Sequence, residues 1–113
     1  MLPPANRLRR DNDIKRVLGS KTGVYDTVAG LKYVKNGSDA SRFAVVVPNK
    51  VTKIAVKRNA VRRQYREIFR LHLAEIAPGF DVILLVGKPA LDLAFDEKAS
   101  RLLRNLRKAK LIA

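Results

Sequence analysis

The segment Asn49–Leu73 constrains the fold most, because it is both strongly basic and regularly apolar, with Glu67 as its single acid. On a helix that turns about 100° per residue, apolar side chains share one arc and arginines fill the adjoining arc. The apolar set is Val61, Tyr65, Ile68, Phe69, His72 and Ile76. The basic set is Lys50, Lys53, Lys57, Arg58, Arg62, Arg63, Arg66 and Arg70. We therefore predict a helix, from about Ala55 to before Pro78, that buries one face and presents another to a polyanion.

Length and charge limit the class of protein. A chain of 113 residues suits one domain, and a hydrophobic fraction of 47% allows a modest core. The formal net charge is +14, and a phosphate backbone is the usual partner of so positive a surface. We expect a single domain over residues 1–113, with a basic lead-in at 1–10 and a frayed tail at 108–113.

The missing residue types exclude several kinds of site. The chain has no Cys, which excludes disulfides and thiolate metal sites and fits a reducing cytoplasm. The single His, His72, lies on the apolar arc, so we expect it in or beside the core rather than in catalysis. No apolar run approaches the ~20 residues that span a bilayer, so no membrane partner is expected. No motif assembles carboxylates for two-metal hydrolysis. These observations indicate a cytoplasmic binding protein without catalytic residues.

The segments before the basic helix predict a short helix and two strands. Asp11 resembles an N-cap, and Gly19 is a natural stop after an apolar stripe. That stripe consists of Ile14, Val17 and Leu18. Thr27–Lys35 has strand character, with Ala29, Leu31 and Tyr33 on one face, and a further short strand is possible near Val24. A turn cluster at 36–39 separates it from the strand-forming run Arg42–Val47, which favours a β-hairpin.

The segments after the basic helix predict one strand and one helix. The run Asp81–Val86 is almost wholly apolar, as expected of a central strand buried on both faces. A last helix follows, with Asp92 or Asp96 as candidate caps. Its apolar face is Phe95, Ala99, Leu102, Leu103 and Leu106, and its basic face is Lys98, Arg101, Arg104 and Arg107. The expected order is therefore α-β-β-(β)-α-β-α, an α+β fold.

The basic arc favours nucleic-acid binding over a merely solvated face. Lys and Glu mixtures make a helix soluble, whereas arginine forks onto phosphate and stacks on bases. Two details stay open at this point. Asn59 could be a capping or turn residue, which local spacing favours, or an amide that bonds RNA beside Arg58. The arginines of the lead-in could touch phosphate or form a solvated arm; they are Arg7, Arg9 and Arg10.

The run Val56–Arg70 resembles the protein subunit of bacterial ribonuclease P. That family carries the signature A-V-x-R-N-R-x-K-R-x-x-R-E on a long helix. The positions that match it are Ala55, Val56, Arg58, Asn59, Arg63, Arg66 and Glu67. Arg62 replaces the usual Lys and keeps its charge, Ala60 replaces the third member of the Arg-Asn-Arg triplet, and Lys53 stands where many members have Gly. The likeness extends over nearly the whole chain.

The resemblance implies a fold. It is a single domain with a central mixed sheet and a split β-α-β unit, like a domain of a small-subunit ribosomal protein. The family joins its parallel strands by a left-handed crossover through the arginine-rich helix, against the usual right-handed rule.

The resemblance also implies a function. In the family, a catalytic RNA uses Mg²⁺, held mainly by the RNA, to cleave the 5′ leader from precursor tRNA, so the protein is a non-catalytic subunit. The implied contacts with the catalytic RNA are Arg58, Asn59, Arg62, Arg63 and Arg66, with Lys50, Lys53, Lys57 and Arg70 in support. The implied leader cleft is lined by Ile14, Leu18, Leu31, Tyr33 and Val45. Metal ligands on the protein are not implied. The alternatives are a ribosomal or RNA-chaperone protein of similar fold, and a nuclease that acts alone.

Overall fold

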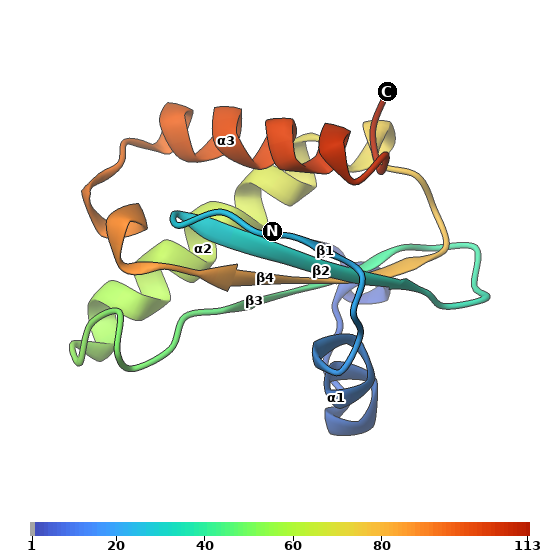
Figure 1. Cartoon of the computed structure of the whole chain (residues 1–113), viewed down its shortest axis with the longest axis horizontal. Helices are drawn as coiled ribbons and strands as arrows, with labels where there is room; N and C mark the ends of the chain where they lie inside the picture. The colour runs from blue at the N-terminus through green and yellow to red at the C-terminus, as the bar shows by residue number, and fades with distance from the viewer. Residues whose placement is uncertain (1) are drawn as a thin grey trace.

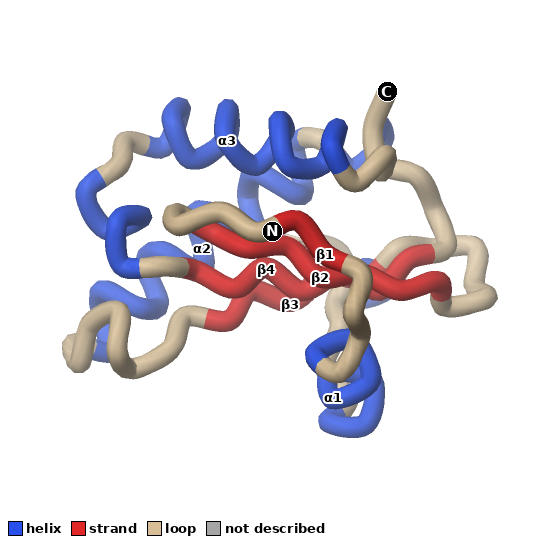
Figure 2. The backbone as a smooth tube through the Cα atoms, viewed as in Figure 1, coloured by secondary structure: helices blue, strands red, loops and turns tan. Residues whose placement is uncertain are grey.

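Four strands form one mixed sheet, with helices on both of its faces (Figures 1 and 2). The computed structural model describes residues 2–113. The strands lie in the order β1-β2-β4-β3, and β4 runs antiparallel to β2 and parallel to β3. Their bounds are β1 (Gly23–Val24), β2 (Ala29–Lys35), β3 (Arg42–Val46) and β4 (Phe80–Val86). The α+β class, the mixed central sheet and the short strand at Val24 are confirmed.

The helices divide between the two faces of the sheet. The first, α1 (Asp11–Leu18), lies on one face, while α2 (Ala55–Leu71) and α3 (Phe95–Lys108) cover the other (Figure 1). Short 3-10 helices are η1 (Pro4–Asn6), η2 (Leu73–Glu75) and η3 (Lys88–Asp92). The start of α2 at Ala55 and its end before Pro78 confirm the predicted central helix.

The central place of β4 follows from its composition. Its side chains alternate between the faces, and both sets are apolar apart from Asp81 near the start of the strand. Val82, Leu84 and Val86 join the large core beneath α2 and α3. Ile83 joins the smaller core beneath α1, together with Leu8 and Val17. The prediction of a central strand buried on both faces is confirmed.

The predicted hairpin between β2 and β3 is wrong. The two strands do not pair, because β4 lies between them and hydrogen-bonds to both. A strand that is apolar on both faces loses more water-exposed surface in the middle of a sheet than at its edge. The expected β3-α2-β4 unit is present, but it is not split, since β3 and β4 are direct neighbours. The left hand of the crossover stays a prediction.

The amino-terminal segment is docked rather than extended into solvent. Leu2 and Leu8 are 1% and 4% exposed. The Leu8 N–H donates to the Phe43 carbonyl at 2.9 Å, so this segment lies along the outer edge of β3. The alternative of a solvated arm is therefore wrong for Arg7, whose Nε donates to the Leu2 carbonyl at 2.7 Å. Arg9 and Arg10 are exposed, and their contact with phosphate stays a prediction.

The predicted frayed tail is also wrong. Leu111 is 1% exposed, and its carbonyl accepts a hydrogen bond from the Ala77 N–H at 2.7 Å. The Leu111 N–H donates to Leu106 and the Lys110 N–H donates to Arg107, which is the Schellman arrangement at a helix end. Lys110 supplies the required left-handed backbone, with φ of 62°. Apolar burial of Leu111 explains why the tail is ordered.

The expected aspartate caps are wrong in detail. Arg10 occupies the N-cap position of α1, so Asp11 is the first helical residue and makes no capping hydrogen bond. The N-cap of α3 is Ala94 rather than Asp92 or Asp96. Asp11 and Asp96 nevertheless lie in first turns, where a negative charge offsets the helix dipole.

Candidate nucleic-acid interface

A groove of about 720 Å³ runs between the amino-terminal segment, α1, β3 and α2. Its residues come from parts of the chain that are far apart in the sequence. They are Leu2, Arg7, Leu8, Arg9, Ile14, Phe43, Ala44, Val45, Val46, Arg62, Arg63, Arg66 and Glu67. The groove therefore combines an apolar floor with basic walls on both sides.

The arginine wall follows from the pattern of α2. The helix buries Val61, Tyr65, Ile68 and Phe69 against the sheet, and Phe69 stacks on Phe43 with ring centroids 4.5 Å apart. Because the basic arc adjoins this buried arc, it lies along the edge of β3. Arg62, Arg63 and Arg66 thus form one side of the groove, and we call these three residues the arginine ridge.

The arginine ridge is crowded with like charge. The pKa of Arg66 is lowered by burial first, and then by the positive charges of Arg62 and Arg7. Arg7 belongs to the opposite wall of the groove. Bringing cations together from two walls costs free energy that an anion between them would offset.

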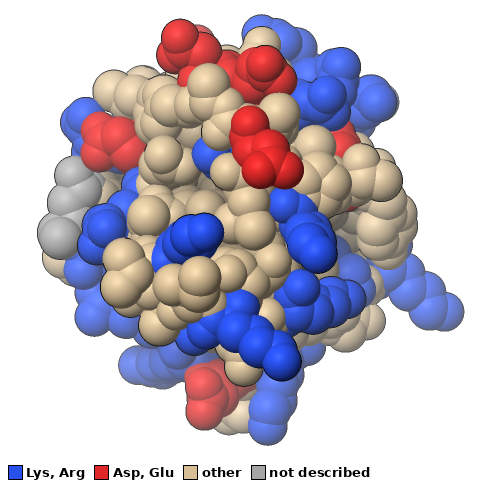
Figure 3. Space-filling view, turned by 90° about the vertical axis from the view of Figure 1, so that its left-hand side faces the viewer, with Lys and Arg blue, Asp and Glu red and all other residues tan. Residues whose placement is uncertain are grey.

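The residues at the start of α2 extend the basic surface. Lys50, Lys53 and Lys57 are exposed. Figure 3 shows basic side chains spread over the lower part of this end of the molecule, with acidic ones mostly toward the top. Arg58 has a structural role as well, since its Nη1 donates to the Thr52 carbonyl at 2.9 Å and fastens the preceding loop to the helix.

Two predicted contact residues are already engaged within α2. Asn59 lies inside the helix and accepts a hydrogen bond from Arg62, so the cap interpretation is wrong. Arg70 is exposed and donates through Nε to Glu67 at 2.7 Å. His72 follows the helix as its C-cap, half-buried, with Nδ1 2.5 Å from Glu75 Oε2. The contacts of Asn59 and Arg70 with RNA stay a prediction, and the half-buried position of His72 fits its expected place beside the core.

The five residues expected to line a leader cleft do not lie together. Leu31 is fully buried in the core beneath α2 and α3, and Tyr33 packs against Phe80 on that same face. Neither lines the groove. Successive strand side chains point to opposite faces, so their neighbours Lys32 and Val34 face α1 instead. The periodicity was correct, but nothing local indicated which face α1 would cover.

Of the three other residues predicted to line the leader cleft, two line the groove and one does not. Ile14 and Val45 line the groove, although the Val45 side chain packs into the large core. Leu18 is 36% exposed and does not line it. The sequence reasoning missed Leu8, Ala44 and Val46, which form much of the apolar floor. The alternation along β3 could have identified Ala44 and Val46 as one face.

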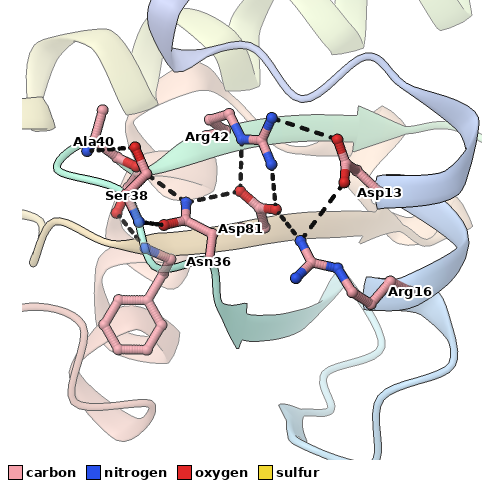
Figure 4. Close-up of polar contacts among 9 residues, drawn as sticks. Asp13, Arg16, Asn36, Ser38, Ala40, Arg42 and Asp81 are labelled. Carbon is pink, nitrogen blue, oxygen red and sulfur yellow. Dashed lines mark hydrogen bonds and ion pairs between the residues drawn. The ribbon is translucent and has the colours of Figure 1, made fainter.

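A buried carboxylate lies beneath α1, at the start of β4. Asp81 is fully buried, and Arg42 donates to it from Nε at 2.8 Å and from Nη2 at 2.7 Å (Figure 4). Asn36 donates at 2.9 Å, and Arg16 of α1 donates to the other oxygen. Burial alone would raise the pKa of Asp81, but the bonds from Arg42 and Asn36 and the charges of Arg42 and Arg16 hold it below its ordinary value.

Neither a metal centre nor a membrane span is found in the part of the chain that the structure describes. Residues 2–113 contain no group of three or more His, Cys, Asp or Glu side chains able to hold a metal ion. Within the same range, no helix has the length and apolarity needed to cross a bilayer.

The fold and groove define a class, a small basic α+β domain with an arginine-lined groove. The family model described as Ribonuclease P matches residues 2–110. The chain therefore belongs to the family of ribonuclease P protein components.

Curated relatives and solved structures agree with this family. The ribonuclease P protein component of a Pseudanabaena species is 34% identical over 113 residues, which cover 99% of this chain and 97% of that one. The Staphylococcus aureus RNase P protein has 26% identity and a TM-score of 0.86, covering 96% of this chain and 98% of that one. The Thermotoga maritima RNase P protein has 29% identity and a TM-score of 0.82, covering 90% and 96%.

Proposed function

We propose that this chain is the protein subunit of a cytoplasmic ribonuclease P, an endoribonuclease of tRNA processing. It binds the catalytic RNA and the 5′ leader of precursor tRNA, and assists Mg²⁺-dependent removal of the leader. One observation carries the proposal: a single groove brings the arginine ridge against an apolar floor. The RNA-binding helix and the leader site are then two walls of one continuous surface.

Each part of the groove has a distinct task. The arginine ridge and the lysines of the preceding loop neutralise RNA phosphates, which fixes register without reading sequence. The floor of Leu8 and Val46, together with Ile14 of the α1 wall, accepts the faces of unstacked leader bases. Aliphatic side chains cannot stack as aromatic ones do, a contact worth ~1–3 kcal/mol per base. Leader binding in this protein therefore depends more on charge.

The chemistry of cleavage belongs to the RNA partner. A bound Mg²⁺ supplies a hydroxide nucleophile and stabilises developing charge on oxygen. The described residues of this chain hold no cluster that fits such an ion, so we assign no Mg²⁺ ligand to it. Its own contribution is to bind, orient and neutralise.

Reconstitution tests the proposal. The purified chain is mixed with precursor tRNA, with and without ribonuclease P RNA, at low Mg²⁺. We expect the protein to raise the rate and substrate affinity of the RNA-catalysed reaction. Cleavage by the protein alone would indicate a lone nuclease. No gain in the holoenzyme would favour a ribosomal or chaperone role.

A further inference from the structure

The Asp81 cluster ties α1 to the sheet at several points. Arg42 and Asp81 face each other across the parallel pair β3 and β4. Arg16 reaches down from α1 to Asp81, and Asp13 of the same helix lies 3.4 Å from Arg42 Nη1 (Figure 4). Arg16 thus connects α1 directly to Asp81 of β4. Asp13 connects α1 to Arg42 of β3, which itself donates to Asp81.

Apolar packing alone holds α1 weakly. The helix runs from Asp11 to Leu18, and Val17 is its one fully buried side chain, all of its residues being described. Ile14 is half-buried, and Leu18 is 36% exposed. A helix this short is marginal unless tertiary contacts fix it. The ionic contacts therefore decide its position as much as the apolar ones.

The same helix forms part of the groove. Ile14 lies in sequence between Asp13 and Arg16, and it contributes to the groove lining. Opposite it are Ala44 and Val46, which follow Arg42 on the same face of β3. The cluster thus fixes both the α1 wall and the start of the strand that makes the floor.

We infer that Asp81, acting through Arg16 and Arg42, is a positioning residue that sets the spacing between Ile14 and the β3 floor, and so the grip on the leader. The inference rests on the proposed function. Asp81 is sealed from solvent and touches no RNA itself. Among the described residues its side chain bonds to Arg16, Asn36 and Arg42 and to none of the arginine ridge, so we expect its loss to affect the leader and to leave contacts of the ridge with the catalytic RNA unchanged.

The test compares two substrates in the reconstituted holoenzyme, a precursor tRNA with its leader and the mature tRNA without it. The preference is the ratio of their dissociation constants. We expect Asp81→Asn to reduce this preference by up to about fivefold, the low end of what one aromatic stacking contact contributes, because the floor is aliphatic. The substitution makes the protein more positive, so a general charge effect would tighten RNA binding instead.

Asp26→Asn is the matched control. Asp26 is a largely buried aspartate whose carboxylate accepts from the Val28 N–H at 2.9 Å and from Asn105 of α3, on the sheet face opposite α1. Its loss changes the charge by the same amount and also removes structural hydrogen bonds. We expect Asp26→Asn to keep the wild-type leader preference.

A second variant, Arg16→Met, keeps the inference testable if Asp81→Asn does not fold. It frees α1 from Asp81 but leaves Arg42 to neutralise the carboxylate, and Arg16 is half exposed. We expect it to lower the leader preference in the same direction, with a thermal transition close to that of wild type. An unchanged preference in both Arg16→Met and a folded Asp81→Asn would overturn the inference. A wild-type holoenzyme without any leader preference would instead overturn the proposed function.

Discussion

The Tyr65 hydroxyl is buried and has no hydrogen-bond partner within the described part of the chain. An unsatisfied buried polar group costs free energy that a shape-matched apolar side chain does not. We expect Tyr65→Phe to leave the free energy of unfolding unchanged or to raise it by up to about 1 kcal/mol. Urea denaturation at neutral pH measures it. A clear loss of stability would show that the hydroxyl is bonded through water.

The raised pKa of Tyr65 gives a second test of its burial, at alkaline pH. Burial, followed by the charge of Asp26, raises the pKa of Tyr65 to about 12. Between the ordinary value near 10 and this value, the unfolded chain releases the proton and the folded chain keeps it, so stability falls as pH rises. The Tyr65→Phe variant should therefore lose less stability than wild type over that range.

Lys110 adopts a left-handed backbone conformation at the end of α3, which costs free energy for a residue other than glycine. Its φ of 62° suits glycine better than a residue with a β-carbon. We expect Lys110→Gly to raise the free energy of unfolding by about 0.5–1 kcal/mol. Lys108→Gly removes the same charge from within the helix, where glycine costs up to about 1 kcal/mol, and should destabilise. Thermal melts of the two variants should shift in opposite directions.

At the scale of elements, α2 combines a core face with the arginine ridge. We expect Arg62→Ala together with Arg66→Ala to weaken RNA binding and to flatten its log–log salt dependence by about two units, since each lost phosphate contact releases about one counterion less. Titrations at several salt concentrations measure the slope. Arg107→Ala with Lys108→Ala, at the exposed end of α3, is the control for net charge. If both pairs change the slope equally, the ridge is not a specific contact.

The elements were predictable where the signal is local. The basic and apolar arcs of α2 lie on one continuous helix, so periodicity located both the core face and the arginine ridge. The two-sided apolar run of β4 likewise indicated a central strand. Pairing could not be predicted in the same way, because the insertion of β4 between β2 and β3 depends on segments distant in the sequence.

Only one wall of the groove could be predicted from the sequence. Its α2 wall follows from charge pattern, but the opposite wall forms because Leu2 and Leu8 dock along β3, which no local pattern indicated. The face of β2 that α1 covers is also a tertiary property, so Leu31 and Tyr33 were assigned to the wrong side. Lys98 shows the same limit, since it lies on a basic helical face yet is buried, and its Nζ donates to the Leu93 carbonyl at 2.7 Å.

At the scale of the whole molecule, Asp26 and Asp81 make the free energy of unfolding depend on pH in the acidic range. A hydrogen bond from the Val28 N–H lowers the pKa of Asp26, and the pKa of Asp81 is lowered as well. Both contributions are complete above the ordinary pKa near 4 and are lost as pH falls through the lower folded values. We expect wild type to lose stability steeply below pH 4. Urea midpoints should differ between wild type and Asp26→Asn at pH 7, and converge toward pH 2.5.

Both sheet faces share the central strand, so the molecule should unfold as one unit. The cores beneath α1 and beneath α2 meet across β4. We expect far-ultraviolet circular dichroism and the near-ultraviolet tyrosine signal to give a single coincident transition. Two separated transitions would mean that α1 and the amino-terminal segment melt independently.

The docking of residues 2–8 along β3 has a consequence for self-association. An unpaired apolar strand at the boundary of a sheet is a template on which a second molecule can add its own strand. Arg7 and Leu8 occupy part of that boundary from within the chain. The segment that shapes one wall of the groove thereby also discourages neighbouring copies from joining edge to edge.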